Sequence, residues 1–359
     1  MYFFKTFLRP PLKCMESQAS EPQDTQCDDD MVDHVGSGKL VLKESATTVK
    51  STPLFGVIRG SSSDSSRSEP EIEVEPGAVE LDIDECIEKV GEARPWPEDR
   101  FQNVRLLQNA ARNQGKVELQ KDLSNGKFVA VKRMPITWTG TNHEDFVQRH
   151  PSETELPWVD IGLAKYLHAK GFLFICEPFG TFYSDSETYF VSEFADKGDL
   201  FEWCQSGPTP GEEREQMLRP VARQIVTAVQ HLHSLHIAHC DLSLENILLT
   251  TSSDNTPQVK LIDFGMAAIK QDLLVGPRGK PSYQAPEMHE QGSYDPCLAD
   301  AFSVGVVLFG MVAQDYPWLS TKPNGCKCFE FTRQKGLQAY LMKRKARNSD
   351  GARLSQVFS

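Results

Sequence analysis

The sequence predicts an α+β fold, and three observations support this class. The run Phe128–Lys132 is β-branched and apolar, which is typical of a strand, and further β-prone stretches occupy residues 247–249 and 259–262. Residues 154–167 carry apolar side chains at helical spacing. The run 301–313 is almost entirely apolar but too short to span a bilayer, so it fits a buried helix. With 359 residues, the chain can form one large domain plus an additional segment.

Residues 1–95 are that additional segment and are predicted to be a mostly disordered, acidic leader. The stretches 23–33, 61–66 and 69–75 are polar or acidic and poor in aromatic residues. Residues 1–100 hold 11 basic and 21 acidic side chains, so they carry −10 of the formal net charge of −12. The leader is interpreted either as a phosphorylatable regulatory segment or as a solvated stretch without a specific role.

Composition argues against several classes of protein. The folded part is close to neutral and shows no basic patch of the kind that binds nucleic acid, and no membrane partner is expected. Nine cysteines are scattered without a CxxC pair, which suits a reducing compartment, so a cytoplasmic location is expected. Residues 1–13 have basic but no acidic side chains, so a targeting peptide is the alternative, although two prolines and the lack of Ser fit it poorly.

Two short motifs carry the chemistry. His239–Asn246 has the sequence His-Cys-Asp-Leu-Ser-Leu-Glu-Asn, and Ile262–Gly265 has the sequence Ile-Asp-Phe-Gly. Phosphoryl transfer needs one Asp to receive a hydroxyl proton, and an Asn and a second Asp to hold Mg²⁺ against the phosphates. In order and residue type, the two motifs resemble the catalytic loop and the magnesium loop of eukaryotic protein kinases.

Further motifs extend this resemblance from about Phe101 to Phe331. Phe128–Lys132 resembles the family's strand with the phosphate-gripping Lys, and Tyr283–Glu287 resembles the end of its activation segment. The resemblance implies a two-lobed protein-kinase-like fold, with a small antiparallel β-sheet lobe that includes a C helix and a larger, mainly α-helical lobe. The implied boundaries are 101–195 for the N-lobe and hinge, 196–345 for a C-lobe without the family's last helices, and 346–359 for a tail.

The resemblance also implies a role for each motif residue, with ATP and Mg²⁺ as cofactors and proteins as substrates. Asp241 would be the catalytic base, and Asn246 and Asp263 would bind the metal. Lys132 would hold the phosphates, with Asp160 as its partner on the C helix. The other implied contacts to the nucleotide are Gly115, Val117, Ala130, the backbone of Glu193 and Ala195, Asp199 and Leu248.

The upper lobe departs from the family pattern at two places. The expected glycine-rich loop, residues 110–115, keeps only Gly115, so it is either a weakened phosphate cradle or an ordinary polar turn. The C-helix position holds Asp160, one methylene shorter than the family's Glu. Glu155 is the alternative partner for Lys132, and an exposed Asp160 without a partner is the third interpretation.

The catalytic loop and the activation segment both depart from the family pattern, and their departures are related. Cys240 replaces the Arg that receives the activation-loop phosphate in many kinases, and residues 266–281 contain no Ser, Thr or Tyr. The segment is therefore predicted to order without phosphorylation. Ser243 replaces the catalytic-loop Lys, whereas Lys280 stands where Ser/Thr kinases usually have Thr. We infer that the cation has moved to the facing wall and that Lys280 is catalytic; a surface Lys in a mobile loop is the alternative.

The end of the chain is predicted to weaken the lower lobe. One amphipathic helix is expected at Cys328–Lys345, and the family's two final helices have no counterpart. Glu287 would then be a buried carboxylate without its usual Arg, which is a costly state. The apolar residues expected to be exposed on the helix 302–312 are Val304, Val307, Leu308 and Met311.

The predicted function is ATP-dependent transfer of phosphate to Ser/Thr of proteins. Asp-Leu-Ser-Leu-Glu-Asn resembles the loop of Ser/Thr kinases more than the Ala/Arg-rich loop of tyrosine kinases. The alternative is a pseudokinase or ATP-binding signalling scaffold, which the poor glycine loop, Asp160 and the short C-lobe favour. The presence of Lys132, Asp241 and Asp263 argues against that alternative. A purely structural fragment is the third interpretation, and the oligomeric state is left open.

Overall fold

The computed structural model describes residues 84, 87, 93–110, 114–269 and 273–344. These residues all belong to one of the two units into which the chain divides. The second unit, residues 17–79, lies outside the described residues. The predicted disorder of the leader up to residue 83 and the predicted tail, residues 346–359, also lie outside them and stay predictions.

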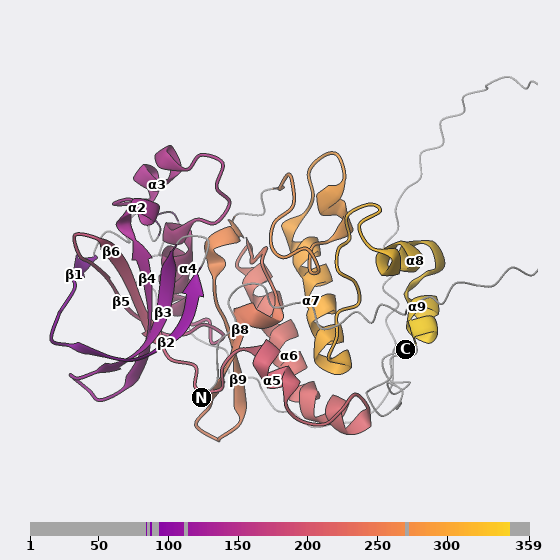
Figure 1. Cartoon of the computed structure of the whole chain (residues 1–359), viewed down its shortest axis with the longest axis horizontal. Helices are drawn as coiled ribbons and strands as arrows, with labels where there is room; N and C mark the ends of the chain where they lie inside the picture. Colours follow the sequence, from indigo (N-terminus) through magenta and orange to yellow (C-terminus); the bar gives the residue numbers. More distant parts are fainter. Residues whose placement is uncertain (1–83, 85–86, 88–92, 111–113, 270–272, 345–359) are drawn as a thin grey trace, which may run out of the picture. The chain divides into compact units, whose positions relative to one another are not determined.

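A six-stranded sheet forms the first part of the described unit (Figure 1). All neighbouring strands run antiparallel except β1 and β5, which pair in parallel. The order across the sheet is β1 (Arg94–Pro95), β5 (Pro178–Tyr183), β6 (Glu187–Glu193), β4 (Phe128–Pro135), β3 (Gly115–Asp122) and β2 (Phe101–Ala110). The two small two-stranded sheets pair β8 (Ile247–Thr251) with β9 (Pro257–Leu261), and β7 (Ile237–Ala238) with β10 (Ala268–Ile269).

Strand β4 shows why this sheet has two different faces. Successive side chains of a strand point to opposite faces, so the alternation in β4 separates Val129 and Val131 from Ala130 and Lys132. The two valines are 1% and 0% exposed and pack in a cluster with aromatic side chains. Lys132 projects from the opposite face. The alternation along this strand therefore places one cation on the face where the candidate site lies.

The sheet begins earlier than the predicted domain boundary. Arg94 and Pro95 form β1 and pair with Phe182 and Tyr183 of β5. Ile87 is also buried, at 6% exposed, and belongs to the main hydrophobic cluster. Part of the stretch predicted as a mostly disordered leader thus contributes to the folded unit, because it supplies an edge strand and a buried aliphatic side chain.

Three helices follow β4 and precede β5. The first two, α2 (Ile136–Thr139) and α3 (His143–Arg149), were not predicted. The sequence does contain a local signal for the start of α3, because Asn is a favoured N-cap residue. The Asn142 side chain caps α3 by accepting a hydrogen bond from the Asp145 backbone N–H at 2.8 Å. The third, α4 (Pro157–Ala169), is the helix predicted at residues 154–167, and it begins at Pro157 because proline favours the first helical position.

Helices dominate the rest of the chain (Figure 1). Hydrophobic side chains from all of them except the last join the largest core cluster together with residues from α4, β8 and β9. These helices are α5 (Leu200–Gln205), α6 (Glu212–Ser234), α7 (Pro296–Ala313), α8 (Lys327–Lys335) and α9 (Leu337–Arg344), with short 3-10 turns η2 (Leu244–Asn246), η3 (Phe264–Met266) and η4 (Pro286–His289).

Helix α7 is better covered than the sequence indicated. Val304, Val307 and Met311 are 9%, 0% and 1% exposed, so the prediction that they form an exposed apolar patch was wrong; only Leu308 is half-buried. The helix starts at Pro296, earlier than the apolar run, and so reaches 18 residues with a mean hydropathy of 1.8. That length and composition could cross a membrane, but 56% of the helix is buried within the described protein, as for a core helix.

The single helix predicted at Cys328–Lys345 is two helices. Gly336 ends α8 with φ of 85°, a left-handed conformation that glycine adopts without strain, and its N–H donates to the Thr332 carbonyl. Helix α9 then returns Tyr340 to the core, where it is 4% exposed and its hydroxyl donates to the Pro317 carbonyl. The break allows a short chain segment to cover this end of the lobe.

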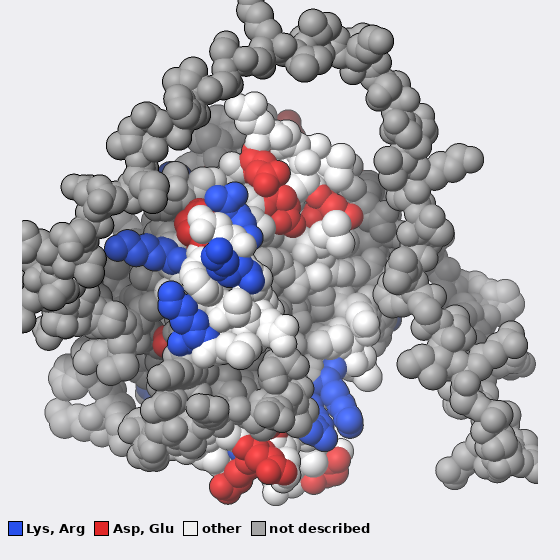
Figure 2. All heavy atoms as spheres, turned by 90° about the vertical axis from the view of Figure 1, so that its right-hand side faces the viewer, with Lys and Arg blue, Asp and Glu red and all other residues white. Residues whose placement is uncertain are grey.

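Basic side chains gather on the face that contains α8 and α9 (Figure 2). The composition did not indicate this cluster, because the net charge of the folded part is close to zero. Acidic side chains lie beside the basic ones on the same face, so the expectation that the folded part has no basic patch of the kind that binds nucleic acid stays a prediction. The exposed cations of the two helices are Lys327, Arg333, Lys335 and Lys343, of which Arg333 pairs with Glu330 at 2.8 Å.

Candidate active site

The register of three adjacent strands assembles one wall of the site. Val117 of β3 lies opposite Lys132 of β4, and Ala130 of β4 lies opposite Ser192 of β6. Directly opposed residues share a sheet face, and Ala130 and Lys132 are two positions apart on one strand. Val117, Ala130, Lys132 and Ser192 therefore line the same face. Val117, Ala130 and Lys132 were predicted from the family pattern as nucleotide contacts.

Lys132 lies between two carboxylates. Its Nζ is 2.7 Å from Asp160 Oδ2 on α4 and 3.3 Å from Asp263 Oδ1. Burial alone would lower the pKa of Lys132, but the two carboxylates outweigh it and raise the pKa, so the side chain stays charged. The cation in turn lowers the pKa of Asp263. Of the partners considered for Lys132, the structure places Asp160 in direct contact, although its side chain is one methylene shorter than that of Glu.

Asp160 also joins α4 to the magnesium-loop motif. Its Oδ1 accepts a hydrogen bond from the Phe264 backbone N–H at 2.8 Å, and the Leu156 N–H donates to the Gly265 carbonyl at 2.8 Å. Asp263 itself has φ of 67°, the left-handed conformation that Asp tolerates better than most residues. This backbone geometry turns the Asp263 carboxylate toward Lys132, so one carboxylate on α4 orients both the cation and the loop.

The catalytic-loop motif is held mainly through its backbone. Asp300 of α7 accepts hydrogen bonds from the backbone N–H groups of His239 and Cys240, at 2.7 and 2.9 Å. The His239 ring is hydrogen-bonded to the Ile262 carbonyl at 3.0 Å, directly before the magnesium loop. Cys240 is buried and has φ of 62°. Burial and the nearby Asp300 raise the pKa of its thiol, so Cys240 stays neutral.

Asp241 has one engaged and one available carboxylate oxygen. The Asn246 amide donates to Asp241 Oδ2 at 2.8 Å and to the Asp241 carbonyl at 2.7 Å. Asp241 Oδ1 is buried and has no hydrogen-bond partner among the described residues. Burial raises the pKa of Asp241, and the positive charge of Lys280 partly opposes that rise. A buried carboxylate oxygen without a donor is suited to accept a proton from an incoming hydroxyl.

Gly279 is a site residue that the sequence analysis missed. It has φ of 75°, and a Cβ atom at this position would lie 2.9 Å from Asp241 Oδ1 and 2.9 Å from the Cys240 carbonyl. Any side chain here would therefore press on the candidate base. The local sequence Gly-Lys-Pro carries a weak turn signal, but only the fold brings it beside a loop 38 positions earlier in the chain.

Lys280 lies on the wall that faces the catalytic loop. Its Nζ donates to Ser243 Oγ at 2.6 Å and is 3.2 Å from Glu245 Oε2. The Lys is thus in contact with the residue that replaces the family's catalytic-loop cation, as the paired substitution suggested. The Gln284 amide donates to the Gly279 carbonyl at 2.9 Å and so holds the turn that carries Lys280.

The remaining predicted nucleotide contacts lie around the strand wall and the hinge. Asp199 caps α5 by accepting from the Glu202 N–H at 2.7 Å, and its backbone bridges to Leu248, so these two residues are adjacent. The Glu193 carboxylate is 3.0 Å from Lys260 Nζ, and Ala195 beyond it is buried. Gly115 opens β3 opposite Ala110, whereas residues 111–113 of the predicted glycine-rich loop lie outside the described residues.

The donor set suits a hard cation bound together with phosphates. Asp263 and Asn246 supply carboxylate and amide oxygens near Asp241, and Mg²⁺ is usually held by one or two carboxylates plus substrate phosphates. Within residues 84–344, apart from the gaps given above, no group of three His, Cys, Asp or Glu side chains forms a self-contained metal site. The residues present therefore fit a metal that arrives with a nucleotide.

Glu287 differs from its predicted environment. It was expected to be a buried carboxylate without a cation, but it is only half-buried, on the short turn η4. Among the described residues Glu287 forms no ion pair, which agrees with the expected lack of an Arg partner. Because Glu287 is only half-buried, however, it does not carry the large free-energy penalty of a fully buried charge. Partial access to water removes most of that penalty.

The comparison with known families agrees with this geometry. A family model described as the protein kinase domain matches residues 113–351, more than half of the chain. The chain belongs to the protein kinase family. Its fold is accordingly the two-lobed α+β fold of that family, with the sheet and α4 in the small lobe and the helices from α5 onward in the large lobe.

Curated relatives of this kinase domain include plant and yeast proteins. It is 32% identical over 218 residues to CBL-interacting protein kinase 32 of Oryza sativa subsp. japonica, covering 58% of this chain and 47% of the relative. It is 32% identical over 212 residues to serine/threonine-protein kinase GIN4 of Saccharomyces cerevisiae, covering 57% and 18%. It is 30% identical over 208 residues to CBL-interacting serine/threonine-protein kinase 5 of Arabidopsis thaliana, covering 56% and 42%. The aligned region spans less than half of each relative.

Proposed function

We propose that this chain catalyses ATP-dependent phosphorylation of Ser/Thr residues in proteins. The observation that carries the proposal is the pair of ion pairs formed by Lys132, whose Nζ is 2.7 Å from Asp160 and 3.3 Å from Asp263. Active kinases need this Lys–carboxylate pair and the magnesium-loop Asp in place together. Here both are formed although the helix supplies Asp in place of Glu.

Each residue has a distinct part in the proposed reaction. Lys132 holds the phosphates of the nucleotide, and Asp263 and Asn246 provide oxygen ligands for magnesium. Bound Mg²⁺–ATP supplies the transferable phosphoryl group and neutralises part of its charge. Asp241 accepts the proton of the substrate hydroxyl through Oδ1, which no described residue engages. Lys280 stabilises the charge on the transferred group from the facing wall.

Three features support the finer parts of the proposal. The motif Asp-Leu-Ser-Leu-Glu-Asn resembles Ser/Thr kinases, and two of the relatives are named serine/threonine kinases. Residues 266–281 carry no hydroxyl side chain, and the position of the usual phosphate-binding Arg is the buried Cys240, so activation without loop phosphorylation is proposed as well. A cytoplasmic location is proposed on the scattered cysteines, of which those described are free thiols.

The test is transfer of labelled γ-phosphate from Mg²⁺–ATP to a Ser/Thr peptide library. Wild-type protein should label peptides, and Asp241→Asn should lower the rate by roughly 10²–10⁴ while nucleotide affinity is kept, because only the proton acceptor is lost. Asp185→Asn, at an exposed position in the β5–β6 turn, is the matched control. No transfer by the wild type, with nucleotide binding intact, would favour the pseudokinase alternative.

A further inference from the structure

The β8–β9 hairpin holds the hinge on both sides of Ala195. On the β6 side, Glu193 Oε2 is 3.0 Å from Lys260 Nζ of β9. On the other side, Asp196 Oδ1 accepts a hydrogen bond from the Thr251 backbone N–H of β8 at 2.7 Å. The backbone of Glu193 and Ala195 is where the nucleotide base is predicted to bind. The two contacts therefore flank the predicted base site.

Lys260 is buried, at 8% exposed, although it carries an ammonium group. Such a group is costly to remove from water unless it is paired and hydrogen-bonded. Lys260 Nζ has two acceptors, the Glu193 carboxylate at 3.0 Å and the Ile175 carbonyl at 2.9 Å. Glu193 Oε2 also accepts from the Glu177 N–H at 3.2 Å, and the Glu193 N–H donates to the Glu177 carbonyl at 2.8 Å. One cation therefore fixes the end of β6 and the segment before β5.

Lys260 is also next to the floor of the predicted nucleotide site. It lies directly opposite Leu248 in the pairing of β8 with β9. Directly opposed residues of paired strands lie close together on one face of the sheet. Leu248 belongs to the large lobe, whereas Glu193 ends a strand of the small lobe. Lys260 thus joins two predicted nucleotide contacts, one from each lobe.

We propose that Lys260 is a positioning residue for the adenine of ATP. Through Glu193 it fixes the backbone groups of the hinge, and the directional hydrogen bonds of a flat base require such fixed partners. The proposal rests on the proposed function, because it assumes that ATP binds at the hinge. The phosphates are held elsewhere, by Lys132 and the metal ligands. Loss of the Lys260 cation should therefore weaken the binding of adenine and leave the binding of phosphate unchanged.

The experiment measures the binding of two probes to the full chain by isothermal titration calorimetry in the presence of Mg²⁺. Adenosine reports on the hinge side of the site, and inorganic tripolyphosphate reports on the phosphate side. Lys260→Met keeps the aliphatic stem and removes the cation. It should weaken adenosine binding by about tenfold, the loss of one well-aligned hydrogen bond, and leave tripolyphosphate binding unchanged. Lys260→Arg, which can still donate to Glu193, should retain most of the adenosine affinity.

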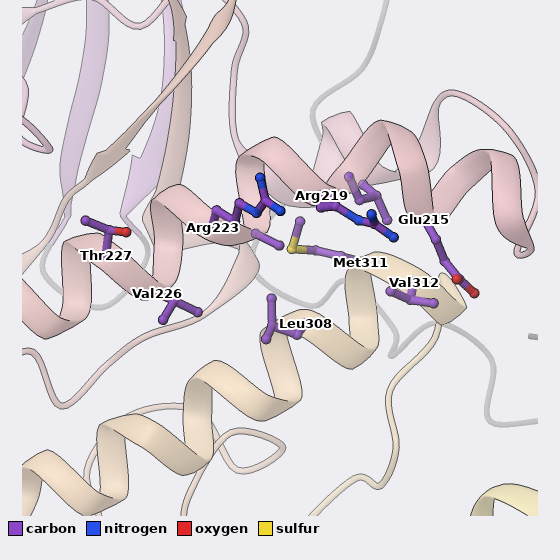
Figure 3. A pocket seen from close by; sticks show the side chains of 10 residues that line it. Glu215, Arg219, Arg223, Val226, Thr227, Leu308, Met311 and Val312 are labelled. Atoms are coloured by element: carbon purple, nitrogen blue, oxygen red, sulfur yellow. The ribbon is translucent and has the colours of Figure 1, made fainter. Parts of the chain in front are cut away.

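Kinetics and a double-mutant cycle give independent measurements. Lys260→Met should raise the KM for ATP by the same factor and keep kcat within about twofold of wild type. Glu193→Gln should weaken adenosine binding as well, but no further when it is combined with Lys260→Met, because both act through one pair. Glu193→Gln also carries the test if Lys260→Met unfolds. Arg223→Met is the matched control, because Arg223 is exposed and lines a separate pocket of about 410 Å³ between α6 and α7 (Figure 3).

The two probes distinguish a positioning role from a purely structural one. Unchanged adenosine binding by Lys260→Met would overturn the proposal. Equal weakening of adenosine and tripolyphosphate would also overturn it, because the cation would then support the whole domain and not the hinge. Wild-type protein that binds adenosine but transfers no phosphate would contradict the proposed catalysis alone. Wild-type protein that binds neither probe would overturn both proposals.

Discussion

Replacement of Lys280 by Ala tests whether this side chain stabilises the transferred phosphoryl group or only anchors its loop. In the structure Lys280 Nζ contacts Ser243 Oγ at 2.6 Å and Glu245 at 3.2 Å. The Lys and Glu side chains are 35% and 31% exposed, and such an ion pair contributes at most about 1 kcal/mol, or roughly fivefold in any equilibrium it controls. Loss of a preorganised charge at the transition state instead costs about 2.7–4 kcal/mol, roughly 10²–10³ in kcat.

Steady-state kinetics with varied ATP distinguish these two magnitudes. Lys280→Ala should lower kcat by roughly 10²–10³ with little change in the KM for ATP, whereas Lys327→Ala, exposed on α8, should behave as wild type. The double variant Ser243→Lys, Lys280→Thr restores the family arrangement and should recover part of the loss. Lys280 also lowers the pKa of Asp241, so its removal should move the acidic limb of the pH–rate profile to higher pH. A kcat within a few-fold of wild type and an unmoved acidic limb would refute the catalytic role.

Four further predictions concern the same site. Gly279→Ala should abolish transfer and leave nucleotide binding intact, because the new methyl group would meet Asp241 Oδ1 at 2.9 Å; an active Gly279→Ala enzyme contradicts the packing described. Asp160→Asn should lower kcat/KM and destabilise the domain by about 1–3 kcal/mol in urea unfolding, since Lys132 loses its nearest carboxylate; an unchanged midpoint would argue against this pair. The wild-type kcat/KM should fall as pH drops through a pKa above the usual value of Asp, because burial raises the pKa of Asp241 and the protonated acid accepts no proton; a limb at or below the usual value disagrees. Phosphatase treatment should leave the rate of a variant without residues 1–83 unchanged, because residues 266–281 have no phosphorylatable side chain; a large drop would contradict this.

Much of the candidate site follows from local sequence. Asp241, Asn246 and Asp263 stand in short motifs whose spacing alone brings them to two adjacent turns joined by the β8–β9 hairpin. Lys132 lies on a strand with a period of two, which sets the face from which it projects. The resemblance to the family's C helix pointed to Asp160, and this residue contacts Lys132 in the structure. Such features depend on neighbours within one element, and the sequence records those directly.

Only the tertiary structure decided which surfaces are buried and which distant segments meet. The apposition of Gly279 and Asp241 joins two loops that no local pattern relates. The burial of Val307 depends on the packing of α7 against α6 and β7, which lie far away in the sequence. The partial exposure of Glu287 and the division of one expected helix at Gly336 likewise became visible only in the structure. Periodicity states that a helix has an apolar face, but whether a neighbour covers it depends on packing across the whole domain.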